Sequence, residues 1–144
     1  MRIKLTLLVF LIFLLPPSLS AMEEVKTGYD LFLNLQLMEN PQSPEDITKG
    51  LLAVGYLKGC VDGFILMQDA HFNNMFPPDM MSEAERVKVS KELNFHQINM
   101  PAEGIATGQL ILIYNKFAKD QPKKLNGTAR LCIWESIVSA YGWK

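Results

Sequence analysis

The side chains that most often carry chemistry are few in this 144-residue chain. It has two histidines, His71 and His96, and two cysteines, Cys60 and Cys132. Neither histidine lies beside a serine or cysteine in a recognisable nucleophile motif. Cys60 lies between a glycine and a valine, where a thiol is expected to be inert because reactive thiols need electropositive, partly exposed surroundings. We therefore expect no catalytic residues and a protein that is not an enzyme.

Soft potential metal ligands gather in the middle of the chain. They are Met67, His71, Met75, Met80, Met81, His96 and Met100. Thioether and imidazole groups suit copper, and Met67 precedes His71 by one helical turn. Methionine also fills gaps in cores and contacts partners, and this set lacks dense, repeated Met/His spacing. We expect core or interface methionines and no bound metal or cofactor, with copper binding as an alternative.

The first 21 residues have the pattern of a secretory signal peptide. Arg2 and Lys4 precede an uncharged run of 11 residues, 5–15, followed by Pro-Pro-Ser-Leu-Ser-Ala. This run is shorter than the roughly 20 residues that a membrane-spanning helix needs. We expect cleavage after Ser20 or Ala21, export to the periplasm, and one domain over residues 22–144 with no membrane anchor.

Composition narrows the function further. The formal net charge is −1, and removal of Arg2 and Lys4 with the signal peptide leaves a mildly acidic domain. A basic surface for nucleic acid is therefore absent from the composition. An even number of cysteines in an exported protein is more often a structural disulfide than a reactive pair, and two free buried thiols are the alternative.

Helical periodicity recurs through the exported part, and no alternating strand pattern competes with it. The expected helices cover residues 24–38, 43–70, 82–93, 107–119 and 126–141. Ser43 with Asp46, and Ser82 with Glu85, have the spacing of an N-cap and an acidic residue three positions later. Asn126 is expected to cap the last helix. The sequence thus predicts an all-α, compact bundle of about five helices.

Apolar spacing predicts which faces are buried. The positions are Leu31, Leu35 and Met38 in the first helix, Leu110, Ile113, Tyr114 and Phe117 in the fourth, and Leu131, Trp134, Val138 and Tyr141 in the last. Gly55, Gly59 and Gly63 recur every four residues, at a cost of about 1 kcal/mol each relative to alanine. We expect this stripe to let another helix of the bundle approach closely.

The segment Met-Phe-Pro-Pro-Asp-Met-Met over residues 75–81 has an unusual composition for a linker. Together with residues 72–74 it is expected to be irregular, because two prolines follow one another. Spacing alone leaves two interpretations equally open. The segment either folds back as a lid on the core or forms an exposed apolar patch that contacts a partner.

Three motifs, in order, carry a resemblance to a known family. They are Gly55-Tyr56-Leu57 with Gly59 and Asp62, Pro101-x-Glu103-Gly104-Ile105 with Gln109, and Pro122-x-x-Leu125 before the last helix. Over about residues 27–143 the chain resembles the Tai-type immunity proteins, which neutralise amidase effectors of type VI secretion. That family commonly has cysteines at positions that hold Leu35, Ala53, Asn99 and Trp143 here. Its usual disulfides are therefore absent, and a Cys60–Cys132 bond between the second and last helices is a hypothesis.

The resemblance implies a periplasmic immunity protein that blocks the active-site cleft of a peptidoglycan amidase with a loop. The expected partner-binding residues are Asn74, Met75, Phe76, Pro77, Asp79 and Met80. A contact around residues 95–99 is an alternative, because the region 78–98 is longer than the family pattern. The family also implies a homodimer, with the glycine stripe as one possible seam. A periplasmic helical chaperone is the competing function.

Overall fold

The structure, a computed structural model, describes residues 25–93, 97–101 and 103–143. The described chain is all-α, as the sequence predicted, and contains no named strand. Its elements are α2 (Gly28–Leu37), α3 (Pro44–Met75), α4 (Glu83–Glu92), α5 (Thr107–Asp120), the 3-10 helix η2 (Pro122–Asn126) and α6 (Ala129–Tyr141). The predicted signal peptide, residues 1–21, lies outside the described residues.

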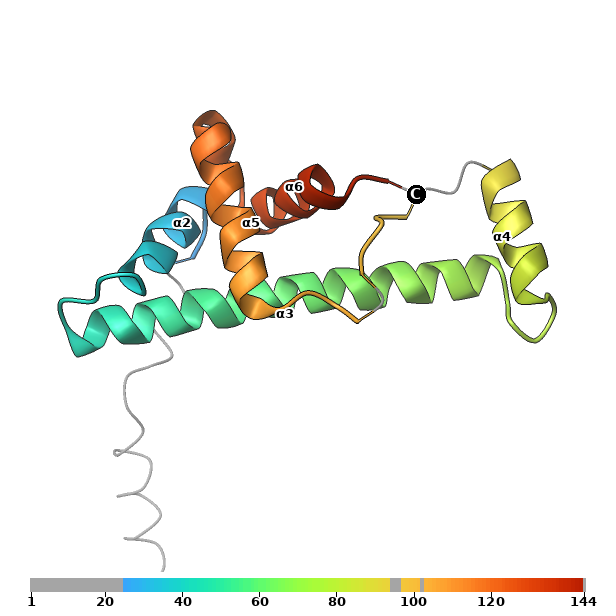
Figure 1. Cartoon of the computed structure of the whole chain (residues 1–144), viewed down its shortest axis with the longest axis horizontal. Helices are drawn as coiled ribbons and strands as arrows, with labels where there is room; N and C mark the ends of the chain where they lie inside the picture. The colour runs from blue at the N-terminus through green and yellow to red at the C-terminus, as the bar shows by residue number, and fades with distance from the viewer. Residues whose placement is uncertain (1–24, 94–96, 102, 144) are drawn as a thin grey trace, which may run out of the picture.

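Helix α3 runs the length of the molecule and carries the other helices (Figure 1). Helices α2, α5 and α6 pack against one another and against α3. They lie over the part of α3 that follows its N-terminus, whereas α4 lies beside its far end (Figure 1). The molecule therefore has a packed group of four helices and, at the other end of α3, a separate helical hairpin.

Helix α3 is long and apolar enough to cross a bilayer, by length and composition. Its most apolar window of 18 residues has a mean hydropathy of 1.5, and 22% of that window is buried. A single helix that meets this criterion is weak evidence for a membrane span.

Local capping signals predicted two helix starts correctly. The Ser43 hydroxyl accepts a hydrogen bond from the Asp46 amide at 3.1 Å, and Ser82 forms a capping box with Glu85. The first helix begins at Gly28, later than predicted, because Thr27 forms a capping box with Asp30. The Thr27 amide, which donates to the Asp30 carboxylate at 2.8 Å, holds the pKa of that carboxyl below its usual value.

Two predicted helix boundaries were wrong. Helix α3 continues through residues 72–75, which were predicted to be irregular, and ends at the C-cap Phe76. It stops there because a residue before proline is disfavoured in the α conformation. Asn126 was predicted to cap the last helix, but it is the last residue of η2. The N-cap of α6 is Thr128, whose side chain makes no capping hydrogen bond.

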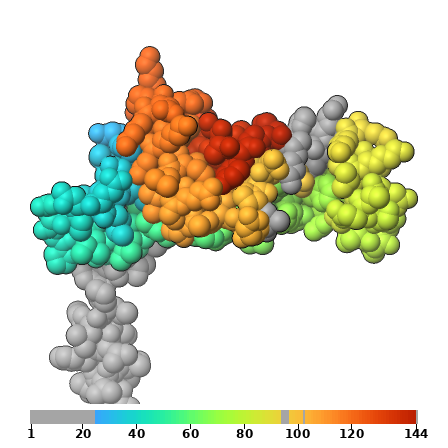
Figure 2. Space-filling model, in the orientation of Figure 1, coloured from blue at the N-terminus to red at the C-terminus, as the bar shows by residue number. Residues whose placement is uncertain are grey.

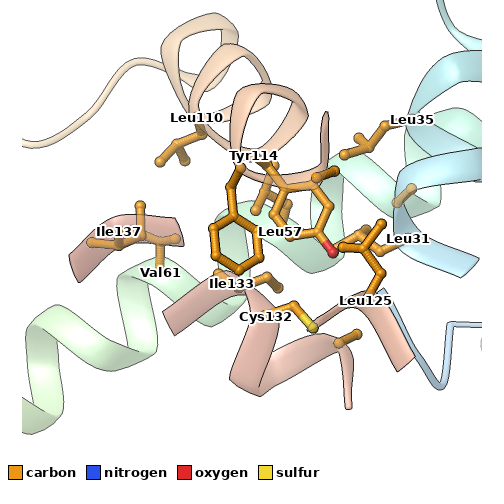
Figure 3. Close-up of a cluster of buried hydrophobic side chains, with 14 of the residues drawn as sticks. Leu31, Leu35, Leu57, Val61, Leu110, Tyr114, Leu125, Cys132, Ile133 and Ile137 are labelled. Atoms are coloured by element: carbon orange, nitrogen blue, oxygen red, sulfur yellow. The ribbon is translucent and has the colours of Figure 1, made fainter. Parts of the chain in front are cut away.

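The core lies where α2, α3, α5 and α6 meet (Figure 3). Its most buried side chains include Leu31, Leu35, Leu57, Val61, Leu110, Tyr114, Cys132, Ile133 and Ile137. Two predicted core positions were wrong: Leu131 is 51% exposed, and Met38 is exposed at the end of α2. Helix α6 packs against both α2 and α5, so its buried face is rotated toward Cys132, Ile133 and Ile137.

The start of α2 lies unusually close to its neighbours. The Tyr114 hydroxyl donates to the Gly28 carbonyl at 2.8 Å, and the Gly28 amide donates to the Gly127 carbonyl at 3.0 Å. A Cβ atom added at Gly28 would overlap the Cys132 sulfur. Glycine is therefore required here by close approach, and this contact joins α2, α5 and α6.

The Tyr114 contact predicts a dependence of stability on pH. Tyr114→Phe is expected to lower the free energy of unfolding by about 1 kcal/mol at neutral pH, because the buried hydrogen bond from the Tyr114 hydroxyl to the Gly28 carbonyl is lost. Burial also raises the pKa of Tyr114 far above its usual value. The free energy of unfolding of the wild type therefore falls as the pH rises above the pKa of tyrosine in the unfolded chain, about 10. Tyr114→Phe has no hydroxyl to ionise at this position, so it does not undergo this part of the fall.

Denaturant unfolding of both proteins at neutral pH and above pH of about 10 measures this difference. The difference in free energy of unfolding between the wild type and Tyr114→Phe should be smaller at the alkaline pH. A gap that stays constant would contradict a buried, neutral Tyr114 in the folded state.

Candidate functional site

The turn between α3 and α4 forms the far end of the molecule (Figures 1 and 2). We call residues 74–81 the tip. The tip is a compact turn, because the amides of Met80 and Met81 both donate to the Pro77 carbonyl at 3.1 Å. Helix α4 then begins after its N-cap, Ser82. The arrangement presents a short, well-defined loop at the end of a long helix.

The predicted contact residues of the tip differ in their exposure to solvent. Met75 and Met80 are 46% and 79% exposed, and Asn74 and Asp79 are exposed as well. Pro77 is half-buried. Phe76, predicted to be an aromatic anchor for a partner, is only 2% exposed. That prediction was wrong because the Phe76 ring turns inward and packs on Phe72, with ring centroids 5.0 Å apart.

A small cluster holds the tip in place. The Arg86 guanidinium lies 4.8 Å from the Phe72 ring centroid and donates to the Asn73 side chain. It also pairs with Glu83 at 3.0 Å. Because Arg86 is itself buried, these contacts tie α4 to the last turn of α3 in a setting shielded from water. The tip is thus exposed while its Phe76 ring packs on Phe72, and contact of the tip with a partner stays a prediction.

Segment 97–101, close to the alternative contact region, is held to the body of the molecule. The Ile98 amide donates to the Gln68 side chain at 2.9 Å, and Ile98 is buried. The Asn99 amide donates to the Gly142 carbonyl at 3.0 Å, although Asn99 is exposed. Phe95 and His96 lie outside the described residues, so the alternative contact stays a prediction.

The cysteines do not form the hypothesised bond, since Cys60 and Cys132 are both free thiols. The Cys132 sulfur is directed toward the carbonyls of Lys124 and Gly127, at 3.3 and 3.8 Å. Burial raises the pKa of both thiols, which disfavours the nucleophilic thiolate. Within the described residues, no group of three or more His, Cys, Asp or Glu side chains could hold a metal ion.

The glycine stripe lies on the side of α3 that faces away from the other helices. Gly55, Gly59 and Gly63 are exposed, and an added Cβ at any of them would meet no atom within 4 Å. The prediction that they pack inside the bundle was therefore wrong. Leu51 and Leu66 are also exposed and lie beyond the two ends of the stripe. We call Leu51, the three glycines and Leu66 the outer face of α3.

Sequence analysis missed a groove between α5 and α6. It has a volume of about 380 Å³ and is lined by side chains that include Ile113, Lys116, Phe117, Ser139 and Tyr141. Tyr141, predicted to be buried, is partly buried against the core, and its hydroxyl accepts from the Gln109 side chain at 3.1 Å at the groove. Among the described residues, no group of three or more His, Cys, Asp or Glu side chains lines the groove, which arises from the crossing of two helices that no local pattern encodes.

The cluster behind the tip predicts a local effect of mutation. Phe76→Ala removes a buried ring and is expected to raise the rate of amide hydrogen exchange in α4 by about tenfold or more, equivalent to about 1.4 kcal/mol. The amides of α5 and α6 should be unaffected, since they belong to the other end of the molecule. Mass-spectrometric hydrogen exchange measures both regions in one experiment.

Met80→Ala is the matched control, because its exposed side chain supports no buried contact. Equal exchange in α4 for Phe76→Ala and Met80→Ala would contradict the proposed support of the tip by Phe76.

Comparison of the chain with family models, with curated proteins and with solved structures finds no match in any of the three.

Proposed function

We propose that this chain is a periplasmic immunity protein that binds and inhibits a peptidoglycan amidase effector of type VI secretion. The observation that carries the proposal is the tip, an exposed and preorganised loop at the end of a helical arm (Figure 2). Inhibition by occupation of a cleft needs a rigid projection and no catalytic residue. The exposed Met75 and Met80 supply apolar contact area for such a cleft.

Rigidity determines how much of the contact energy remains available for binding. A loop that must be ordered on association loses part of its contact energy to conformational entropy. The buried Phe76 and Arg86 already hold the tip before a partner arrives. The exposed Asp79 carboxylate adds a charge that can pair with a histidine of a Cys/His active site. The tip thus combines apolar area, one anionic group and a fixed backbone.

The places of the motif residues support the resemblance. Gly104 has a φ of 81°, and its amide donates to the Pro101 carbonyl at 3.0 Å, so the Pro-x-Glu-Gly motif forms a turn that favours glycine. Leu125, from the Pro-x-x-Leu motif, lies in the core. The Lys58 ammonium pairs with the Asp62 carboxylate. These residues stabilise the fold, so they account for the motifs without being the contact site.

The four positions at which the resemblance expects cysteines offer a second support. Leu35 and Ala53 are both buried in the core, on two helices that pack against each other. Asn99 is hydrogen-bonded to Gly142, next to Trp143. Leu35 and Ala53 thus lie on neighbouring segments of the fold, and so do Asn99 and Trp143. Apolar packing in the first pair and backbone hydrogen bonds in the second connect these segments here.

The proposal is tested with the mature protein and purified amidase effectors of type VI secretion. Met75→Ala combined with Met80→Ala should weaken binding by about 2 kcal/mol or more, because exposed apolar side chains at the centre of a contact dominate its energy. Calorimetry measures the affinity, and release of cleaved peptidoglycan measures inhibition. Leu112→Ala, which truncates an exposed leucine on α5, is the matched control and should bind normally.

Full inhibition by the double variant would eliminate the tip as the contact. Failure of the wild type to bind the amidase, together with suppression of aggregation of unrelated proteins on acidification, would instead support the chaperone alternative.

We infer further that two copies pair through the outer face of α3. The exposed glycines leave room for a close helix approach, and the leucines at the two ends allow an antiparallel copy to match leucine against leucine. In such a pair Lys58 of each copy lies close to Asp62 of the other, which gives charge complementarity. A symmetric dimer needs a self-complementary surface of this kind.

Gly59→Arg tests this pairing by analytical ultracentrifugation. The side chain has open space within one copy, so the fold should be kept, and a dimer should be converted to a monomer. Leu112→Arg is a control for added surface charge. A wild type that sediments as a monomer, or a dimer that Gly59→Arg leaves intact, would rule out this seam.

A further inference from the structure

The groove between α5 and α6 has no role in the proposed inhibition, and it has the size of a site for a small ligand. Its volume of about 380 Å³ lies at the lower end of the range for small-molecule sites. The side chains of Ile113 and Phe117 give it an apolar part. Polar side chains line the rest, among them Lys116, Asp120 and Gln121. The groove therefore combines apolar area with a cation and an anion.

The two charged side chains of the groove do not pair with each other, although their spacing favours pairing. Lys116 precedes Asp120 by four residues on α5, and residues four apart are neighbours on a helix surface. Lys58 and Asp62 have the same order and spacing on α3 and form an ion pair. Within the part of the chain that the structure describes, neither Lys116 nor Asp120 has an ion pair or a side-chain hydrogen bond. Both charges are thus available to a ligand in the groove.

The position of Asp120 does not stabilise its own helix. Asp120 is the last residue of α5, where the terminal carbonyl groups form the negative end of the helix dipole. A carboxylate is unfavourable at this end, and no cation among the described residues pairs with it. Local stability therefore does not account for this residue, whereas a ligand with a positive group does.

The opposite charges limit the chemical class of the ligand. A phosphate ester would be repelled by the Asp120 carboxylate, and a polyamine would be repelled by the Lys116 ammonium. A molecule with one positive and one negative group satisfies both side chains. Residues four apart on a helix have Cβ atoms about 5–6 Å apart, and each residue of an extended peptide spans about 3.3–3.6 Å. The two charged ends of a peptide of two or three residues can therefore reach both side chains.

We propose that the groove binds a short peptide of two or three residues with a free amino group and a free carboxylate. The Lys116 ammonium binds the peptide carboxylate, and the Asp120 carboxylate binds the peptide ammonium. An apolar side chain of the peptide packs against Ile113 and Phe117. The site lies at the packed end of the molecule, away from the tip, so it is independent of the amidase proposal.

The test is a titration of isotope-labelled mature protein with the dipeptide alanyl-leucine, followed by the amide chemical shifts of α5 and α6. The wild type should bind one dipeptide per chain. Lys116→Gln and Asp120→Asn should each weaken binding by about tenfold, because each removes one charge-assisted contact. Both side chains are exposed, so both variants should fold. Lys119→Gln is the matched control, because Lys119 is exposed on the same helix but does not line the groove.

Blocked forms of the dipeptide show which side chain binds which end. Acetyl-alanyl-leucine lacks the ammonium, and alanyl-leucine amide lacks the carboxylate. Each should bind the wild type about tenfold more weakly than the free dipeptide. Lys116→Gln should bind the free carboxylate and the amide equally, and Asp120→Asn should bind the free and the acetylated amine equally. In each case the partner of the blocked group is already absent.

Three results would overturn the proposal. One is the absence of any shift in the wild type at a dipeptide concentration of about 10 mM. Another is equal binding of the free dipeptide and both blocked forms, which would show that the charges are not used. The third is a loss of affinity in Lys119→Gln as large as the loss in Lys116→Gln.

Discussion

The close approach at Gly28 is the constraint on which the packed end of the molecule depends. Three segments meet there within hydrogen-bond distance, and the Tyr114 hydroxyl donates a buried hydrogen bond to the Gly28 carbonyl. A side chain at this position would push the Cys132 region away and open the junction of α2, α5 and α6. The lack of a Cβ atom at Gly28 therefore allows three helices to share one core, and any larger residue there should disturb their packing.

The length of α3 divides the molecule into two parts. Its first turns pack on the core, and its last turns extend past α2, α5 and α6 to carry α4 (Figure 1). The tip lies on this extension, whereas the outer face lies opposite the core. Helix α3 keeps its two ends in a fixed relative position, because the backbone groups of its interior turns are hydrogen-bonded within the helix. Arg86 and Phe76 then fix the hairpin at its end.

Much of the fold could be predicted because its signals are local. The starts at Ser43 and Ser82 depend on residues within one turn, and apolar periodicity identified Tyr114 as a core residue. Predictions failed where distant segments decide the outcome. Phe76 looked like an exposed anchor, but it is buried and packs on Phe72, whose ring also contacts Arg86 of α4. The free state of the cysteines likewise depends on where their helices place them.

The sequence by itself determined the helical class, the main apolar faces and the absence of a recognisable catalytic motif, because periodicity, capping and residue type are properties of neighbouring residues. Tertiary structure alone decided which faces stay uncovered. The glycine stripe looked like an internal packing surface, yet it faces outward because α2, α5 and α6 occupy the opposite side of α3. Burial is a property of the assembled helices, so a pattern that indicates close packing cannot say which helix supplies it.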